Sequence, residues 1–337
     1  MRENAVVEYS LVVPVYNEEE SLRILYGEII EVAKSLDAKI ELIFVDDGST
    51  DSSWSIIESL VQEDERVRGI RFRRNFGKAA ALDVGFKSAT LPIVMTLDAD
   101  LQDDPHEIPD FLRLIDSGYD VVSGWKQRRH DPWHKVFPSH IFNWLVSSIT
   151  GVKLHDHNCG MKCYRREIFD EITLYGELHR FVPVLAAAKG YKIGEKVVNH
   201  RARKYGSSKY GFNRFIKGFL DVLSVKFVTG YGQRPQHFLG TVGLSSFTVG
   251  AATMLWLAFR WTLARLPFLD FAPYNLSGRP AVVYSAALML FGAQILSIGV
   301  VAELIVSYQN RKGREYSVKK EIGKPQKDRT DASSDNS

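Results

Sequence analysis

The sequence predicts an α/β domain with a mostly parallel sheet, followed by an interfacial helix and two transmembrane helices. Two observations support this fold class. In the first 125 residues, short apolar runs alternate with segments of helical character, which is the pattern of crossover units in a parallel sheet. Further along the 337-residue chain, two spans carry no charged side chain and are long enough as helices to cross a ~30 Å hydrocarbon layer.

Five strands are expected in the α/β part, separated by helical segments. The expected strands are Ser10–Tyr16, Ile40–Val45, Val67–Phe72, Pro92–Met95 and Tyr119–Ser123. Helices are expected to open at Asn17–Ser21 and at Pro105, and to cover Ile56–Val61, after a cap at Thr50 or Asp51, and Ala79–Ser88.

A polar cluster follows each of the first four strands. The clusters are Pro14–Glu18, Asp46–Ser49, Arg73–Lys78 and Asp98–Gln102. The carboxyl ends of parallel strands meet at one edge of the sheet, where ligands of such sheets bind. The sequence therefore predicts a binding site at that edge.

The composition argues against a nucleic-acid-binding protein and against a disulfide-stabilised scaffold. The formal net charge of +3 gives no support to a nucleic-acid-binding protein. Two cysteines are too few for a disulfide scaffold and suggest a reducing compartment. The amino-terminal residues lead directly into a strand pattern, so no signal peptide is expected.

The two uncharged spans are Phe238–Phe259 and Ala281–Ala302. Buried core helices are the alternative, but these seldom run so far without a charge. Basic residues flank the pair on both sides, although three arginines in the link weaken the positive-inside bias. Two crossings return the chain to its starting side, so we expect an integral membrane protein with the large domain in the cytoplasm.

The acidic run after the fourth strand is the central candidate site. Asp98 and Asp100 are two residues apart and would project to the same side of an extended backbone, with Gln102 next in phase. Two carboxylates and an amide oxygen are hard ligands that suit Mg²⁺ or Mn²⁺ together with substrate phosphates. The alternative is a solvated acidic turn in which Asp104 or a neighbour caps the next helix.

These clusters resemble the motifs of glycosyltransferase family 2. The resemblance is nearest to its polyprenyl-phosphate branch, of the dolichyl-phosphate mannose synthase and bacterial undecaprenyl-phosphate glucosyltransferase type, and covers roughly Tyr9 to Lys320. The matching segments are Val13–Glu19, Val45–Asp51, Arg74–Lys78 and Asp98–Asp103. The resemblance implies the nucleotide-diphosphosugar-binding fold called GT-A.

The resemblance also implies roles for individual residues. The set that would bind the nucleotide sugar is Pro14, Tyr16, Asn17, Glu18, Asp46, Asp47, Lys78 and Asp98. Asp98, Asp100 and Gln102 would bind the divalent ion, Mg²⁺ or Mn²⁺, that bridges the diphosphate. Taken singly, each has an ordinary alternative, such as a strand terminator, a helix N-terminal charge or a turn.

Asp156 is the second catalytic candidate beside Asp100. It lies in a stretch, His155–Cys163, similar to a family segment that faces the donor sugar, but family members vary in where this acid falls. The histidines and cysteines of the stretch also suggest zinc. Tetrahedral zinc needs four ligands, and no second Cys/His cluster is evident.

Two basic loops are candidates for binding the lipid phosphate and the diphosphate. Arg203, Ser208 and Lys209 match the family's Arg-x-x-Gly-x-Ser-Lys loop, and Arg201 is a neighbour. Charge, hydroxyl donors and a glycine are what phosphate recognition requires, although a solvated loop is the alternative.

The other basic loop contains Arg128 and Arg129 and precedes the aromatic segment Ile141–Val146. This order suits a membrane interface, whereas a surface loop and a packed helix are the alternative.

The expected organisation has four parts. A cytoplasmic GT-A catalytic domain occupies residues 1–210, and an amphipathic juxtamembrane helix occupies 211–236. The two-helix transmembrane region covers 237–308, and a charged, disordered cytoplasmic tail covers 309–337.

The expected activity is inverting, metal-dependent transfer of a hexose to polyprenyl (undecaprenyl) phosphate at the cytoplasmic face of a bacterial inner membrane. Glucose from UDP-glucose is favoured, and mannose from GDP-mannose or a modified pentose remains open. A homo-oligomer is possible, and no nucleic acid is expected as a partner. A polysaccharide synthase is disfavoured because the chain lacks a Gln-x-x-Arg-Trp motif. A non-catalytic membrane scaffold is the remoter alternative.

Overall fold

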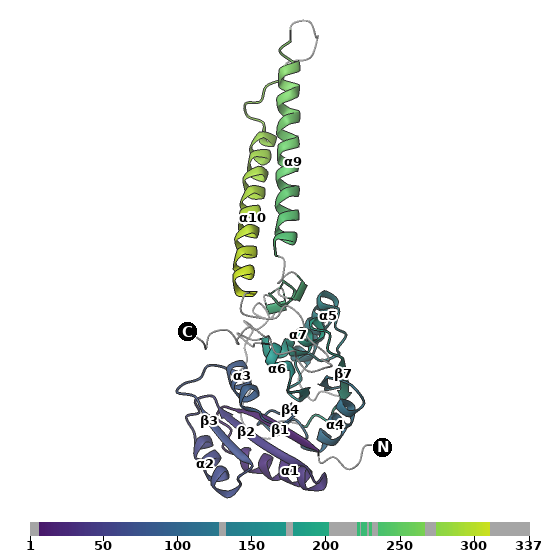
Figure 1. The fold of residues 1–337 in the computed structure, drawn as a ribbon. Helices are drawn as coiled ribbons and strands as arrows, with labels where there is room; N and C mark the ends of the chain where they lie inside the picture. Colours follow the sequence, from purple (N-terminus) through teal and green to yellow (C-terminus); the bar gives the residue numbers. More distant parts are fainter. Residues whose placement is uncertain are drawn as a thin grey trace, which may run out of the picture.

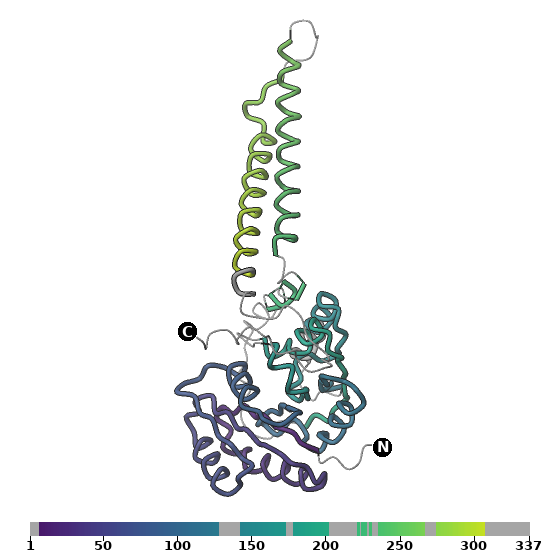
Figure 2. The backbone as a smooth tube through the Cα atoms, viewed as in Figure 1, coloured from purple at the N-terminus to yellow at the C-terminus, as the bar shows by residue number. Residues whose placement is uncertain are grey.

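The computed structural model describes residues 7–127, 133–172, 178–201, 235–266 and 274–310, with short helical pieces between 221 and 230. Figure 1 shows an α/β domain from which two long helices extend side by side, and Figure 2 follows the same path of the backbone.

A seven-stranded sheet organises the domain, in the order β3-β2-β1-β4-β6-β5-β7. The strands are β1 Glu8–Val15, β2 Lys39–Asp46, β3 Val67–Arg71, β4 Ile93–Thr96, β5 Val121–Trp125, β6 Lys162–Arg165 and β7 Ile193–Val197. All neighbours pair in parallel except β6, which is antiparallel to both β4 and β5. The mostly parallel sheet is confirmed, together with the five expected strands; β6 and β7 were not expected.

Helices cover both faces of the sheet because successive strand residues point to opposite sides. On one face, Leu11 and Phe44 pack with residues of α1 (Leu22–Ser35), α2 (Ser53–Glu63) and α4 (Ile108–Asp116). The other face packs against α3 (Lys78–Ser88), α6 (Ile168–Glu171) and α7 (Val182–Ala188). The domain is therefore a three-layer α/β/α sandwich.

Two helix starts differ from expectation. Helix α1 begins at Leu22, not in Asn17–Ser21, because Asn17 adopts a φ of 54° and its side chain accepts a hydrogen bond from the Thr50 amide. Pro105 opens the 3₁₀ turn η1 (Pro105–Glu107) before α4, and the Asp104 carboxylate caps the turn by accepting from the His106 amide.

A third small core joins the domain to the segment that precedes the long helices. Helix α5 (Trp133–Thr150) contributes Val146, which packs with Phe181 of η2 (Leu178–Phe181) and with Val222 and Val225. Part of the predicted juxtamembrane helix thus packs against the catalytic domain. Trp144 on α5 is 68% exposed, as an interfacial aromatic residue would be.

Helices α9 (Pro235–Leu263) and α10 (Pro280–Asn310) are each long and apolar enough to cross a membrane. They pack along each other, and most of their large apolar side chains are exposed, including Leu255 at 70% and Leu290 at 73%. An apolar surface of this extent is unfavourable in water and favourable in lipid. The two helices therefore mark a membrane protein. Residues 311–337, most of the predicted tail, lie outside the described residues.

Candidate active site

The predicted polar clusters meet at one edge of the sheet. Strand β1 lies between β2 and β4, and Pro14 is in register with Val45 while Val12 is in register with Thr96. The segments after these three strands consequently emerge side by side. The edge predicted from strand order is the edge that the structure forms.

Backbone-to-side-chain hydrogen bonds join the loops after β1 and β2. The Asn17 amide donates to Ser49 Oγ at 2.9 Å, and the Thr50 amide donates to Asn17 Oδ1 at 2.8 Å. The Glu18 amide donates to Ser53 Oγ at 2.9 Å. Pro14 and Tyr16 are half-buried beside this network. These hydrogen bonds hold the first polar cluster, Pro14–Glu18, in place at the carboxyl end of β1.

Asp46 and Asp47 hold the neighbouring loops in place. Asp46 is fully buried, accepts from the Ser49 amide at 2.9 Å and pairs with Arg71 at 3.1 Å. Asp47 accepts from the amides of Phe76 and Gly77 at 2.6 and 2.9 Å. These contacts fix the loop that leads into Lys78, the first residue of α3.

Gly48 is required between these loops. Its φ is 72°, and a Cβ there would lie 2.5 Å from the Arg74 carbonyl carbon. Any other residue would be strained and would push the Arg74 loop away from β2.

Asp98 lies at the centre of the edge. Its Oδ1 forms an ion pair of 2.5 Å with the Lys78 ammonium. Burial would raise the pKa of Asp98, but the cations of Lys78, Lys126 and Lys162 outweigh it and lower the pKa to about 2. Gly160 allows the loop before β6 to approach, since a Cβ there would lie 2.5 Å from Asp98 Oδ2.

The expected extended phase of the acidic run is wrong. The backbone turns at Ala99–Asp100, and Leu101 has a φ of 61°. Asp100 causes this turn by accepting a hydrogen bond from the Gln102 amide at 3.2 Å, as short polar side chains commonly do. Asp100 is buried, and the side-chain nitrogen Nε2 of Gln102 lies 3.5 Å from His200 Nε2.

The donor set of this turn is of the kind that magnesium or manganese takes, namely the carboxylates of Asp98 and Asp100 and the amide oxygen of Gln102. Mg²⁺ is usually held in this way, by one or two carboxylates together with substrate phosphates and water. Within the described parts of the chain, no three His, Cys, Asp or Glu side chains form a metal-binding group. Metal binding by Asp98, Asp100 and Gln102 therefore stays a prediction.

A buried ion pair between Lys126 and Asp103 lies next to the acidic turn. Lys126 Nζ lies 2.7 Å from Asp103 Oδ1, and the Asp103 side chain is 1% exposed. Burial would lower the pKa of Lys126, but the Asp103 carboxylate raises it above its usual range. The sequence analysis included Asp103 in the segment Asp98–Asp103 but gave it no role, and it did not single out Lys126.

Asp156 sits in a tight turn before β6. Its side chain is buried and accepts from the Asn158 amide at 3.0 Å, and its own amide donates to Glu195 at 3.1 Å. The hydrogen bond from the Asn158 amide ties Asp156 to a residue that lines the cavity described below. Its catalytic role stays a prediction.

Arg201 joins three elements of the domain. Its guanidinium pairs with Glu28 of α1 at 2.8 Å and with Asp104 beside η1 at 2.7 Å. These contacts give it a structural role, and phosphate binding by Arg201 stays a prediction. The remaining predicted phosphate ligands lie outside the described residues: Arg128, Arg129, Arg203, Ser208 and Lys209.

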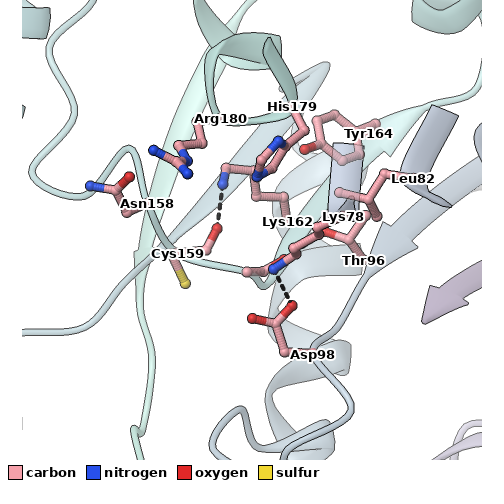
Figure 3. A pocket seen from close by; sticks show the side chains of 11 residues that line it. Lys78, Leu82, Thr96, Asp98, Asn158, Cys159, Lys162, Tyr164, His179 and Arg180 are labelled. Atoms are coloured by element: carbon pink, nitrogen blue, oxygen red, sulfur yellow. Dashed lines mark hydrogen bonds and ion pairs between the residues drawn. The ribbon is translucent and has the colours of Figure 1, made fainter. Parts of the chain in front are cut away.

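A cavity of about 110 Å³ adjoins Asp98 on the α3 side of the sheet (Figure 3). Besides Lys78 and Asp98, it is lined by the polar side chains of Asn158 and Lys162, which belong to the predicted stretch His155–Cys163. The lining also includes Thr96, Tyr164, His179 and Arg180, to which the sequence analysis gave no role. Lys162 and Arg180 are buried, at 4% and 9% exposure. The only sequence signal for His179 and Arg180 is that two basic residues directly precede an apolar helix.

The strand order, the acidic turn after β4 and the adjoining basic cavity define a glycosyltransferase of the GT-A fold. A model of the family described as glycosyl transferase family 2 matches residues 10–173. The chain belongs to this family.

Two relatives match almost the whole chain. Dodecaprenyl-phosphate galacturonate synthase of Rhizobium johnstonii is 39% identical over 305 residues, 89% of this chain and 88% of the relative. Undecaprenyl-phosphate 4-deoxy-4-formamido-L-arabinose transferase of Proteus mirabilis is 36% identical over 323 residues, 94% and 95% of the two chains.

Solved structures share the fold. Glucosyl-3-phosphoglycerate synthase from Mycobacterium tuberculosis, in complex with Mn²⁺, UDP-glucose and phosphoglyceric acid, superposes with a TM-score of 0.51 at 17% identity. The match covers 66% of this chain and 79% of that chain. At this identity the likeness concerns the fold alone.

Proposed function

We propose that the protein transfers a sugar from a nucleotide diphosphosugar to a polyprenyl phosphate. The observation that carries this proposal is the pairing of Asp98 with Lys78 beside Asp100, at the edge of a GT-A sheet whose chain continues into two apolar helices. The names of both relatives contain a polyprenyl phosphate as the acceptor.

The acceptor requires little activation. A phosphate monoester is largely a dianion near pH 7, since its second pKa is about 6. The harder task is to bring this dianion up to a diphosphate. We assign that task to the cations of Arg203 and Lys209 with Arg128 or Arg129, and the positioning of sugar and acceptor to Asp156.

Asp98, Asp100 and Gln102 would hold the divalent ion, which supplies Lewis-acid stabilisation for the departing nucleoside diphosphate. Lys78, which pairs with Asp98, adds a positive charge next to this site. The low pKa of Asp98 keeps its carboxylate ionised at neutral pH, so it is ready to bind a cation. We retain the inverting outcome implied by the family resemblance.

The donor sugar is the open part of this proposal. The sequence favours glucose, whereas the names of the two relatives contain galacturonate and a formamido-arabinose. We place the catalytic domain at the cytoplasmic face of a bacterial inner membrane, where α9 and α10 give access to a lipid acceptor.

The proposal is tested with full-length protein in detergent, undecaprenyl phosphate, Mg²⁺ and a panel of radiolabelled nucleotide sugars. Label from one donor should enter the organic phase, and EDTA or Asp100→Asn should reduce its transfer at least about 100-fold. The exposed substitution Asp170→Asn is the matched control. Transfer that persists in EDTA and in Asp100→Asn would contradict the proposed site.

A further inference from the structure

Side chains from distant elements hold the turn that carries Asp156. This turn, residues 155–158, lies between α5 and β6 and belongs to neither a helix nor a strand. A buried backbone amide or carbonyl is costly without a hydrogen bond, so a turn of this kind needs partners from elsewhere. The partners here are Asn143 of α5, Lys162 of β6 and Glu195 of β7.

Asn143 bonds to the residues on both sides of Asp156. Its side-chain nitrogen Nδ2 donates to the His155 carbonyl at 2.8 Å, and its Oδ1 accepts from the His157 amide at 3.3 Å. Both ends of the side-chain amide are therefore used, which fixes its orientation. Asn143 is 4% exposed, so these bonds are shielded from water. The residue between the two contacts, Asp156, is restrained on both sides.

Glu195 holds the same turn from β7. Its Oε1 accepts from the amides of His155 and Asp156, at 2.8 and 3.1 Å, and its Oε2 lies 2.6 Å from His155 Nδ1. Hydrogen bonds to a carboxylate are roughly twice as strong as those between neutral groups. The His155 ring also stacks on Trp125 at the end of β5, with the ring centroids 4.0 Å apart. The start of the turn is therefore fixed to the sheet.

Lys162 holds the turn on the side of the cavity. Its ammonium donates to the backbone carbonyls of His157, at 3.3 Å, and of Cys159. Burial lowers the pKa of Lys162, and the carboxylates of Asp156 and Asp98 oppose this effect. Lys162 lines the cavity beside Asp98 (Figure 3). One buried cation thus lies close to both the Asp156 turn and the predicted metal site.

We propose that Asn143 and Glu195 are positioning residues, which hold the Asp156 carboxylate beside the cavity for sugar transfer. The inference rests on the proposed function, because it takes Asp156 to position the sugar and the acceptor. Neither Asn143 nor Glu195 is among the described residues that line the cavity, so both act through the turn. A displacement of about 1 Å in a reacting geometry can cost about 100-fold in rate, which a fixed turn prevents.

The first test is hydrogen–deuterium exchange of the full-length protein in detergent, read by mass spectrometry. Asn143→Ala should speed exchange at the His157 amide, and Glu195→Ala at the amides of His155 and Asp156. We expect an increase of about 10- to 100-fold, the effect of losing a hydrogen bond that is shielded from water.

Ser148→Ala is the matched control for exchange, because Ser148 is an exposed residue of the same helix as Asn143. Its substitution should leave exchange of residues 155–158 unchanged. Unchanged exchange in both Asn143→Ala and Glu195→Ala would overturn the inference.

The second test is a double-mutant cycle on sugar transfer to undecaprenyl phosphate. Asn143→Ala should lower kcat by about 10- to 100-fold. Donor affinity, measured by calorimetry without acceptor, should change little, because the substitution leaves the Asp98 site intact. If Asn143 acts through Asp156, Asn143→Ala should have little further effect in an Asp156→Asn background. Effects that multiply in the double variant would overturn the inference, since they would show independent roles.

Glu195→Gln tests the same turn with a side chain of the same shape. The glutamine Oε1 can accept from both amides, so this variant should recover much of the kcat that Glu195→Ala loses. Equal losses in the two variants would contradict the positioning role. If the wild type transfers sugar to no lipid while Asn143→Ala and Glu195→Ala still speed exchange, the positioning of the turn stands and the proposed acceptor is wrong.

Discussion

The Lys78–Asp98 pair shows how one contact can serve both stability and chemistry. Each side chain is 29% exposed, so substrate and solvent can reach the pair. The lysine would move aside or share the carboxylate when a divalent ion binds. Without the ion, the same charge pair stabilises the junction between α3 and β4.

This pair makes the stability of the domain depend on pH. The folded pKa of Asp98, about 2, is below the usual Asp value of about 3.9. A lowered folded pKa contributes stability that is complete above the unfolded pKa and is lost as the pH falls through the folded pKa. The difference in melting temperature between wild type and Asp98→Asn should therefore be largest above pH 4 and shrink between pH 4 and pH 2.

Thermal unfolding of the two proteins in metal-free buffer measures this difference, with Asp83→Asn as the control. Asp83 pairs with Lys87 within α3 and lies outside the predicted site. A difference that stays constant from pH 7 to pH 2 would show that the Lys78–Asp98 pair is not formed in solution.

Helices α9 and α10 meet through glycines. Gly243 and Gly250 of α9 face α10, and Gly292 and Gly299 of α10 face α9, so that the backbones approach closely. Small residues are the usual means of packing helices in lipid, where no hydrophobic force draws them together. Glu303 of α10 also accepts a hydrogen bond from the Gln236 amide at 3.2 Å, at the start of α9.

The substitution Gly292→Ala should destabilise this pair of helices. A Cβ at Gly292 would lie 2.5 Å from the Phe247 nitrogen and 2.6 Å from the Gly243 oxygen, both backbone atoms that cannot turn away. We expect a loss of about 1–3 kcal/mol in stability, measured by thermal unfolding in detergent.

Gly240→Ala is the matched control for this substitution. Its Cβ would meet only the end of the Gln236 side chain, at 3.4 Å. Alanine favours helix more than glycine does, so this variant should be as stable as wild type or more stable. Equal effects of the two substitutions would contradict the packing of α9 against α10.

In the membrane, the catalytic domain and the link between α9 and α10, residues 264–279, should lie on opposite sides. Native Cys159 and Cys163 are both buried, so the unmodified protein should react little with an impermeant maleimide. Single cysteines at exposed Glu65, in the domain, and exposed Ser277, in the link, provide the two probes.

In right-side-out preparations, Ser277→Cys should be labelled and Glu65→Cys protected, and inverted vesicles should reverse the result. Detergent provides the control, since both probes should then react. Labelling of both positions from the same side of intact membranes would mean that α9 and α10 do not both cross.

Local sequence patterns were sufficient for most of the architecture. Strands β1 to β5 are runs of apolar, often β-branched residues, and polar clusters follow β1 to β4, so the ends of these four strands could be located and their common edge inferred. Strand β6, with Lys162 and Arg165 at its ends, has no such run, and the alternation in β7 is short. Both strands depend on tertiary pairing for their formation.

The acidic turn was predictable in composition but not in geometry. Asp98, Asp100 and Gln102 were found by their spacing, whereas the turn depends on the Asp100 side chain and on the φ of Leu101. Arg180 lies far from Asp98 in sequence and reaches the cavity only because η2 packs near α3. Buried cations of this kind become visible only when the fold brings the elements together.

The most direct measurement is the identity of the nucleotide and the lipid formed in a single turnover. Purified protein with UDP-sugar, undecaprenyl phosphate and Mg²⁺ would be analysed by mass spectrometry of the lipid and chromatography of the nucleotide. Sugar transfer to the lipid phosphate predicts UDP and a lipid with one phosphate and one sugar, in equal amounts. Release of UMP with a lipid carrying two phosphates would show sugar-phosphate transfer and contradict the proposed reaction.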